Sequence, residues 1–101
     1  MVCEVSESIA VLIALVERAI EAGASEMEVE YKDGWEEIYA VGSGIGVSIA
    51  RLGATSAEAR ALRNELHAIP KEGQIVQACW CAYRLQVRVL RVLARMRFAS
   101  P

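Results

Sequence analysis

The residues best suited to chemistry in this sequence are three cysteines and a single histidine. Cys3, Cys79, Cys81 and His67 together form a donor set that tetrahedral zinc accepts. Their spacing argues against a zinc site, because Cys79 and Cys81 enclose only one residue and Cys3 lies far away in the sequence. We therefore predict no metal and no cofactor, with small core or interface thiols and a solvent-facing histidine. The odd number of cysteines favours a reducing compartment, so we expect a cytoplasmic protein.

Groups for covalent or acid–base catalysis are scarce. One histidine offers no Ser-His-Asp arrangement, and Glu26, Glu28 and Glu30 alternate with apolar residues, as on a solvent-facing strand. The glycine run over residues 42–46 is not followed by Lys-Ser or Lys-Thr and opens no helix, so it matches neither common phosphate-binding motif. The sequence therefore favours a protein that is not an enzyme.

An arginine stripe near the C-terminus is the strongest charged feature. Its members are Arg84, Arg88, Arg91, Arg95 and Arg97. Such clusters are typical of phosphate contacts in nucleic-acid binding. The pI of about 5.4 argues against a polyanionic partner, and few aromatic residues beyond Trp80 and Tyr83 could stack on bases. Nucleic-acid binding through this stripe is therefore an alternative function that we consider unfavourable.

The two halves of the chain carry opposite net charge. Residues 1–50 contain ten acidic and two basic side chains, a net −8, whereas residues 51–101 contain three acidic and nine basic ones, a net +6. Opposite charges on neighbouring strands can neutralise each other. We therefore expect Arg84 and Arg88 to lie beside the row formed by Glu26, Glu28 and Glu30.

Residues 26–31 and 35–40 predict a β-hairpin. Glutamates alternate with apolar residues over 26–31, and Asp33-Gly34 is a preferred pair for a two-residue type I′ turn. This turn places the apolar residues of both strands on one face. The expected pairs are Lys32 with Trp35, Val29 with Ile38, Met27 with Ala40, and Glu30 with Glu37. The last pair is unfavourable unless a cation lies nearby.

A third strand follows, with Ile45, Val47 and Ile49 on one face and small residues on the other. Glycine within a strand often marks the close approach of a ligand or another backbone. The hairpin register places Trp35 and Tyr39 on the same outer side as the small residues. An alternative function is therefore small-molecule binding in a cleft between the sheet and the helices. The candidate residues for this cleft are Trp35, Tyr39, Gly44, Gly46 and Ser48.

Residues 9–22 predict a helix that Ser6 or Ser8 could cap and Gly23 would end. Apolar side chains occupy nearly its whole circumference, so it needs cover on more than one side. Exposed apolar patches mark association sites, and a two-fold self-interface is the commonest arrangement. We therefore predict a homodimer. The interface candidates on this helix are Val11, Ala14 and Leu15.

A second helix is predicted to begin at a capping box formed by Thr55 and Glu58 and to end at Pro70 and Gly73. The remaining segment is ambiguous, because arginines recur at helical spacing while other residues alternate as in a strand. A single helix of this length would reach about 37 Å, against a radius of gyration near 13 Å for a domain of this size.

We therefore predict two C-terminal strands, at about residues 74–79 and 83–92, with a turn near Trp80-Cys81. A helical C-terminal segment is the alternative. The whole chain, residues 1–101, is then one α+β domain, a two-layer sandwich. It has an antiparallel sheet of about five strands with two helices on one face, in the order α-β-β-β-α-β-β.

No membrane span is expected, because the longest unbroken apolar run covers eight residues, 9–16, whereas a span needs about 20. Nothing in the sequence names a substrate or ligand. The composition, 54% hydrophobic, leaves more apolar groups than a small domain can bury. We therefore predict a small non-enzymatic interaction module that associates with itself and binds a protein partner.

Overall fold

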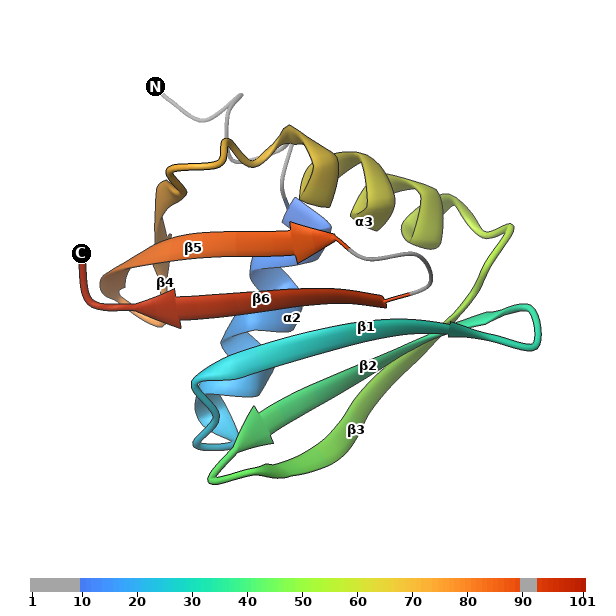
Figure 1. Cartoon of the computed structure of the whole chain (residues 1–101), viewed down its shortest axis with the longest axis horizontal. Helices are drawn as coiled ribbons and strands as arrows, with labels where there is room; N and C mark the ends of the chain where they lie inside the picture. Colours follow the sequence, from blue (N-terminus) through green and yellow to red (C-terminus); the bar gives the residue numbers. More distant parts are fainter. Residues whose placement is uncertain (1–9, 90–92) are drawn as a thin grey trace.

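The computed structural model describes residues 10–89 and 93–101 of the chain, and it has the predicted α+β architecture (Figure 1). The helices are α2 (Ala10–Glu21) and α3 (Ala57–Ala68). The strands are β1 (Glu26–Lys32), β2 (Trp35–Gly42), β3 (Ile45–Gly53), β4 (Gln74–Ala78), β5 (Cys81–Val89) and β6 (Leu93–Ala99). They form one antiparallel sheet in the order β3-β2-β1-β6-β5-β4, which leaves β3 and β4 at the two edges. The sheet therefore has six strands, not about five.

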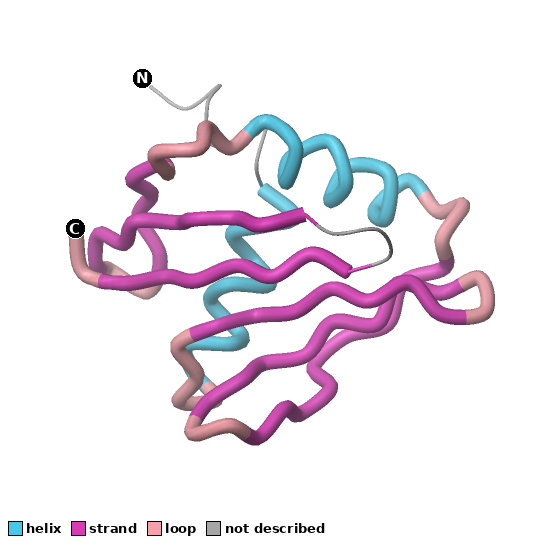
Figure 2. Tube along the Cα trace, viewed as in Figure 1, coloured by secondary structure: helices cyan, strands magenta, loops and turns pink. Residues whose placement is uncertain are grey.

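Side chains from both helices and from the inner face of the sheet share one core. Figure 2 shows α2 crossing behind the strands and α3 running along one side of them. The largest fully buried side chains are Leu12, Val16, Met27, Ile38, Leu62, Leu85 and Met96. No helix in the described part of the chain is long and apolar enough to cross a membrane.

Helix α2 ends as predicted at Gly23, which has a φ of 82°. The Gly23 N–H donates to Ile20 O at 2.9 Å and the Ala24 N–H donates to Ala19 O at 3.0 Å. These two bonds form a Schellman motif, in which glycine readily takes the left-handed conformation that ends the helix. The expected N-caps, Ser6 and Ser8, lie outside the described residues.

The β1–β2 hairpin has the predicted turn and the predicted register. Asp33 and Gly34 both have positive φ, at 52° and 84°, as a type I′ turn requires. All four predicted pairs are observed, including Glu30 opposite Glu37. The turn chemistry and the alternation of side chains point to the same pairing, which is why the sequence was sufficient here.

Strand β3 carries an irregularity that the sequence did not reveal. Its register with β2 shifts between Ile38 and Tyr39, so that Ala50 pairs with Ile38 and Ser48 pairs with Tyr39. The intervening Ile49 therefore forms a bulge. As a result Ala50 joins the core side of the sheet, whereas Ser48 stays on the outer side.

Helix α3 begins one residue later than the predicted capping box implied. Ser56 is the N-cap, and its hydroxyl accepts a hydrogen bond from the Ala59 N–H at 3.1 Å. Thr55 is exposed and precedes the cap. The helix ends before Pro70, as predicted, because proline cannot continue the hydrogen-bond ladder.

The C-terminal segment is extended, so the alternative of a helix is wrong. Strands β4 and β5 match the two predicted strands, but the turn lies at Cys79-Trp80, and β6 was not predicted as a separate strand. Cys79 and Trp80 have positive φ values of 51° and 66°. Neither is a usual type I′ turn residue, so the sequence lacked the common turn signal. The buried Met96 and Phe98 show that β6 has its own core-facing alternation.

Candidate interaction surfaces

Among the described residues of the sheet, the most exposed apolar side chains lie on the edge strand β3. Ile45 is 68% exposed and Val47 is 57% exposed. Residues 42–50 contain no charged side chain and no proline. Natural edge strands are usually protected by charge, proline or short length, because their unpaired backbone groups can template another strand. β3 has nine residues, and it has none of these protections before the bulge at Ile49.

Contacts with the α2–β1 connection hold the end of β2, the strand that pairs with this edge. A Cβ on Gly42 would lie only 3.3 Å from Gly23 O, and the Ser25 N–H donates to Val41 O at 3.2 Å. A shallow cavity of about 160 Å³ lies at this junction, and Ile45 and Val47 form part of its wall. The β2 residues that pair with Ile45 and Gly46 are therefore anchored to the α2–β1 connection.

The opposite edge, β4, is a weaker candidate. It has five residues, against nine in β3. Ile75 on its outer side is 46% exposed. Short edge strands offer few backbone groups for pairing with another chain. A substitution on β4 is therefore a suitable control for the same substitution on β3.

The outer face of the sheet joins the acidic and basic halves of the chain, as predicted, but through other arginines. Arg95 lies opposite Glu28, and their Nη2–Oε2 distance is 2.7 Å. Arg97 lies opposite Glu26. The expectation that Arg84 and Arg88 border the glutamates is wrong, because β6 lies between β5 and β1. Arg91 lies outside the described residues.

The cation near the like-charged pair Glu30 and Glu37 comes from β3. The Arg51 Nε lies 3.3 Å from Glu37 Oε1, and Ser48 donates a hydrogen bond to the same carboxylate. The Arg51 guanidinium also lies 4.6 Å from the centre of the Trp35 ring. This stacking and pairing offset the repulsion that the hairpin register imposes.

The predicted ligand cleft is not assembled. Trp35, Tyr39, Gly46 and Ser48 do share one face, as expected, but it is the outer face and not the side covered by the helices. Gly44 lies in the β2–β3 turn with a φ of 78°. These residues therefore do not line a cleft between sheet and helices.

The predicted apolar patch on the first helix is also not available. Leu15 is only 6% exposed and belongs to the core, and Val11 is partly buried against it. Only Ala14 is exposed. Leu15 lies on the face that packs against α3 and the sheet, because this nearly all-apolar helix is covered from two sides.

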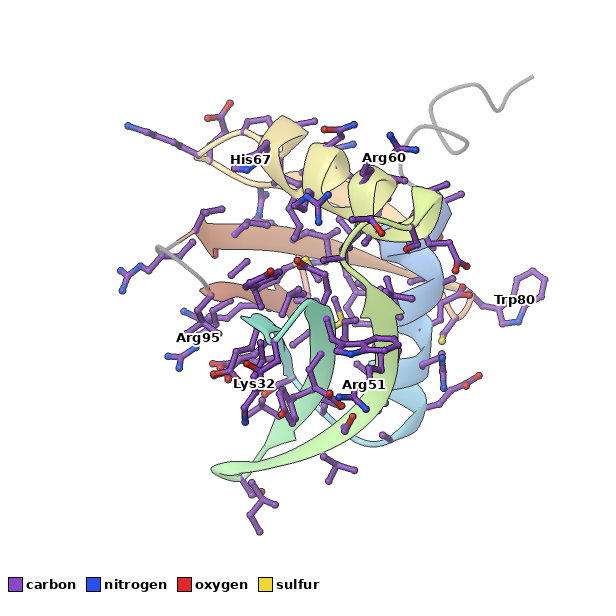
Figure 3. All side chains as sticks on the ribbon, turned by 90° about the vertical axis from the view of Figure 1, so that its right-hand side faces the viewer. Lys32, Arg51, Arg60, His67, Trp80 and Arg95 are labelled. Atoms are coloured by element: carbon purple, nitrogen blue, oxygen red, sulfur yellow. The ribbon has the colours of Figure 1, made fainter. Side chains whose placement is uncertain are left out.

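The cysteines and histidine are not brought together. The Cys79 N–H donates to a Glu17 oxygen at 2.9 Å, while Cys81 is exposed rather than buried. His67 is exposed on α3, far from Trp80 in the β4–β5 turn (Figure 3). Burial and the neighbouring Glu17 raise the pKa of the Cys79 thiol, so it is not activated as a nucleophile. Cys3 lies outside the described residues, which contain no metal-binding cluster of acidic, cysteine and histidine side chains.

Two buried carboxylates, Glu36 and Glu65, were missed by the sequence reasoning. The Leu12 N–H donates to Glu65 Oε1 at 2.7 Å, so α3 supplies an acceptor to the first turn of α2. Glu36 lies on the core side of β2, with Arg63 Nη1 3.3 Å from its Oε2. Such contacts between distant segments leave no periodic signal, although Glu36 occupies an inward position of the predicted hairpin.

No family model, no curated protein and no solved structure matches this chain.

Proposed function

We propose that this protein is a small, non-enzymatic interaction module that forms a homodimer through the edge of β3. In the dimer, β3 pairs antiparallel with β3 of a second copy, and the two sheets become one. The support is the nine-residue edge strand, which has two apolar side chains that are more than half exposed and no charged residue over residues 42–50. The surface differs from the one on the first helix that the sequence suggested.

The sequence of β3 is complementary to itself about Val47. An antiparallel pairing with its two-fold axis at this residue sets Val47 opposite Val47 of the second copy. Gly46 then faces the second copy's Ser48, and Ile45 reaches the bulge at its Ile49. Apolar residues thus meet apolar residues and small residues meet small ones, as favourable cross-strand pairs require. This arrangement is a symmetric self-interface of the commonest type.

The expected interface is small and its affinity modest. Complete burial of a valine or isoleucine side chain contributes about 1.5–3 kcal/mol, and each copy supplies Ile45 and Val47, already partly covered. The ladder of hydrogen bonds adds to this gain, while association costs about 4–15 kcal/mol. We therefore expect a dissociation constant in the micromolar range.

Analytical ultracentrifugation of the whole chain tests the proposal. Wild-type protein should sediment as a dimer at tens of micromolar, whereas Val47→Lys should be monomeric, because it places two lysines opposite each other at the two-fold axis. The matched control is Ile75→Lys on β4, which should remain dimeric. Both variants should keep the wild-type circular dichroism spectrum, since both side chains are exposed. A monomeric wild type, or equal dimerisation of both variants, would refute the proposal.

A partner protein could use the same edge by adding an extended segment to β3. The proposal puts such binding in competition with dimerisation. We place the protein in the reducing cytoplasm, because its three cysteines are an odd number and cannot all pair with one another. Nucleic-acid binding remains the less favoured alternative, because Glu28 already neutralises Arg95.

A further inference from the structure

A cavity lies between α3 and the inner face of the sheet, away from the apolar edge of β3. Its volume is about 430 Å³, within the range of small-molecule sites. Val29, Ala54, Leu66 and Ala94 contribute apolar surface to it. Neither Ile45 nor Val47 borders this cavity, so a ligand here would be independent of the proposed dimer contact.

The polar groups of the cavity are mostly hydrogen-bond donors. Tyr31, Glu36, Arg63 and His67 all line it. Arg63 has five N–H donors and no acceptor, and its one hydrogen bond within the described residues runs to Glu36 at 3.3 Å. This distance is longer than the about 2.7–2.9 Å of a strong charge-assisted bond. The Arg63 side chain is 41% exposed, whereas that of Glu36 is 7% exposed.

The apolar lining and the partly exposed Arg63 indicate which kind of ligand the cavity fits. A guanidinium beside an apolar cavity favours a carboxylate, which can accept two parallel N–H bonds from Arg63. Tyr31 and His67 also line this cavity, and their side chains carry further hydrogen-bond donors. The apolar wall favours a hydrocarbon body attached to that carboxylate. We propose that the cavity between α3 and the sheet binds a small organic acid with an apolar body, its carboxylate held by Arg63.

Glu36 gives this site a distinctive response to mutation. Its buried carboxylate competes with a ligand carboxylate for Arg63 and repels it. Glu36→Gln removes that negative charge while keeping an amide oxygen that can accept from Arg63. Arg63→Gln removes the positive charge that the ligand needs. The two substitutions therefore shift affinity in opposite directions, which a purely structural role of the pair would not produce.

Isothermal titration calorimetry with octanoate is the test, with octanamide and acetate as comparison probes. Octanoate should bind wild-type protein saturably and more tightly than either, because octanamide lacks the charge and acetate lacks the apolar body. Arg63→Gln should weaken octanoate binding about tenfold or more, the value of a hydrogen bond to a charged group. Glu36→Gln should strengthen it. Arg60→Gln makes the same charge change one turn nearer the start of α3, at an exposed residue outside the described lining of the cavity, and should leave binding unchanged.

A cavity-filling variant keeps the proposal testable if Arg63→Gln fails to fold. Ala54→Phe places a ring in the cavity and should abolish octanoate binding without unfolding the protein. No saturable binding of octanoate at about millimolar concentration would overturn the proposal. Equal affinity for octanoate and octanamide, or binding that survives Ala54→Phe, would overturn it as well.

Discussion

The buried carboxylate of Glu65 gives a sharp prediction about stability. It accepts a hydrogen bond from the N–H of Leu12, a residue that is 0% exposed. Glu65→Ala leaves this donor without its partner, which costs about 1–3 kcal/mol. For a domain of this size, each kcal/mol lowers the melting temperature by about 4–8 °C. We therefore expect the melting temperature of Glu65→Ala to fall by about 4–24 °C. Glu65→Gln keeps an acceptor for the Leu12 N–H, so its melting temperature should fall much less.

The pH dependence has a defined sign. Burial raises the pKa of Glu65 above its ordinary value of 4.5, and the hydrogen bonds from the Leu12 and Val11 N–H groups oppose this only partly. The folded protein therefore holds this proton to higher pH than the unfolded chain does. The stability linked to Glu65 is fully present below pH 4.5 and is lost as the pH rises through the raised pKa. Glu65→Gln does not titrate, so it should gain stability relative to wild type as the pH rises.

Urea unfolding of wild type and Glu65→Gln across this pH range measures the effect as a difference, which cancels the titration of the other carboxylates. Glu58→Gln makes the same charge change at an exposed position of α3 and controls for net charge. The reasoning is refuted if wild type instead gains stability relative to Glu65→Gln as the pH rises. That result would mean that the charged carboxylate stabilises the start of α2 by more than its burial costs.

Two further predictions concern exposed features. Trp80 is 100% exposed and has a φ of 66°, a conformation that glycine adopts without strain. Trp80→Gly should therefore raise the melting temperature, because relief of this strain outweighs the added freedom of the unfolded chain by about 0.5–1 kcal/mol. A lower melting temperature would show that the indole contributes contacts. The wild-type chain should flow through a heparin column at low salt because Glu28 neutralises Arg95, and Glu28→Gln should increase retention; firm binding of wild type would instead favour a nucleic-acid partner.

The sequence predicted those parts of the fold in which local signals agree. The β1–β2 register followed from Asp33-Gly34 together with the alternating side chains, and Gly23 marked the end of α2. The sequence did not predict the elements in which a contact between distant segments, or an uncommon turn residue, takes the place of a local sequence signal. The Cys79-Trp80 turn contains no glycine or asparagine, and the bulge at Ile49 leaves no mark in the alternation.

The candidate surfaces were harder to predict than the fold. Long-range pairing decides which side chains remain exposed, and α2 turned out to be covered on the side that carries Leu15. The opposite net charges of the two halves of the chain correctly indicated that acidic and basic side chains share one face of the sheet. The particular partners depended on the position of β6 between β1 and β5, which sequence alone did not give.

Cysteine cross-linking at Val47 tests the proposed dimer most directly. In an antiparallel pair about a two-fold axis at this residue, the two Val47 Cα atoms would lie about 4.5–5.5 Å apart, a separation that a disulfide can span. Val47→Cys, in a chain whose native cysteines are replaced by serine, should form a covalent dimer rapidly under mild oxidation. Ile75→Cys on the other edge strand should not. A Val47→Cys protein that stays monomeric, or cross-links no faster than Ile75→Cys, would contradict the pairing of β3 with itself.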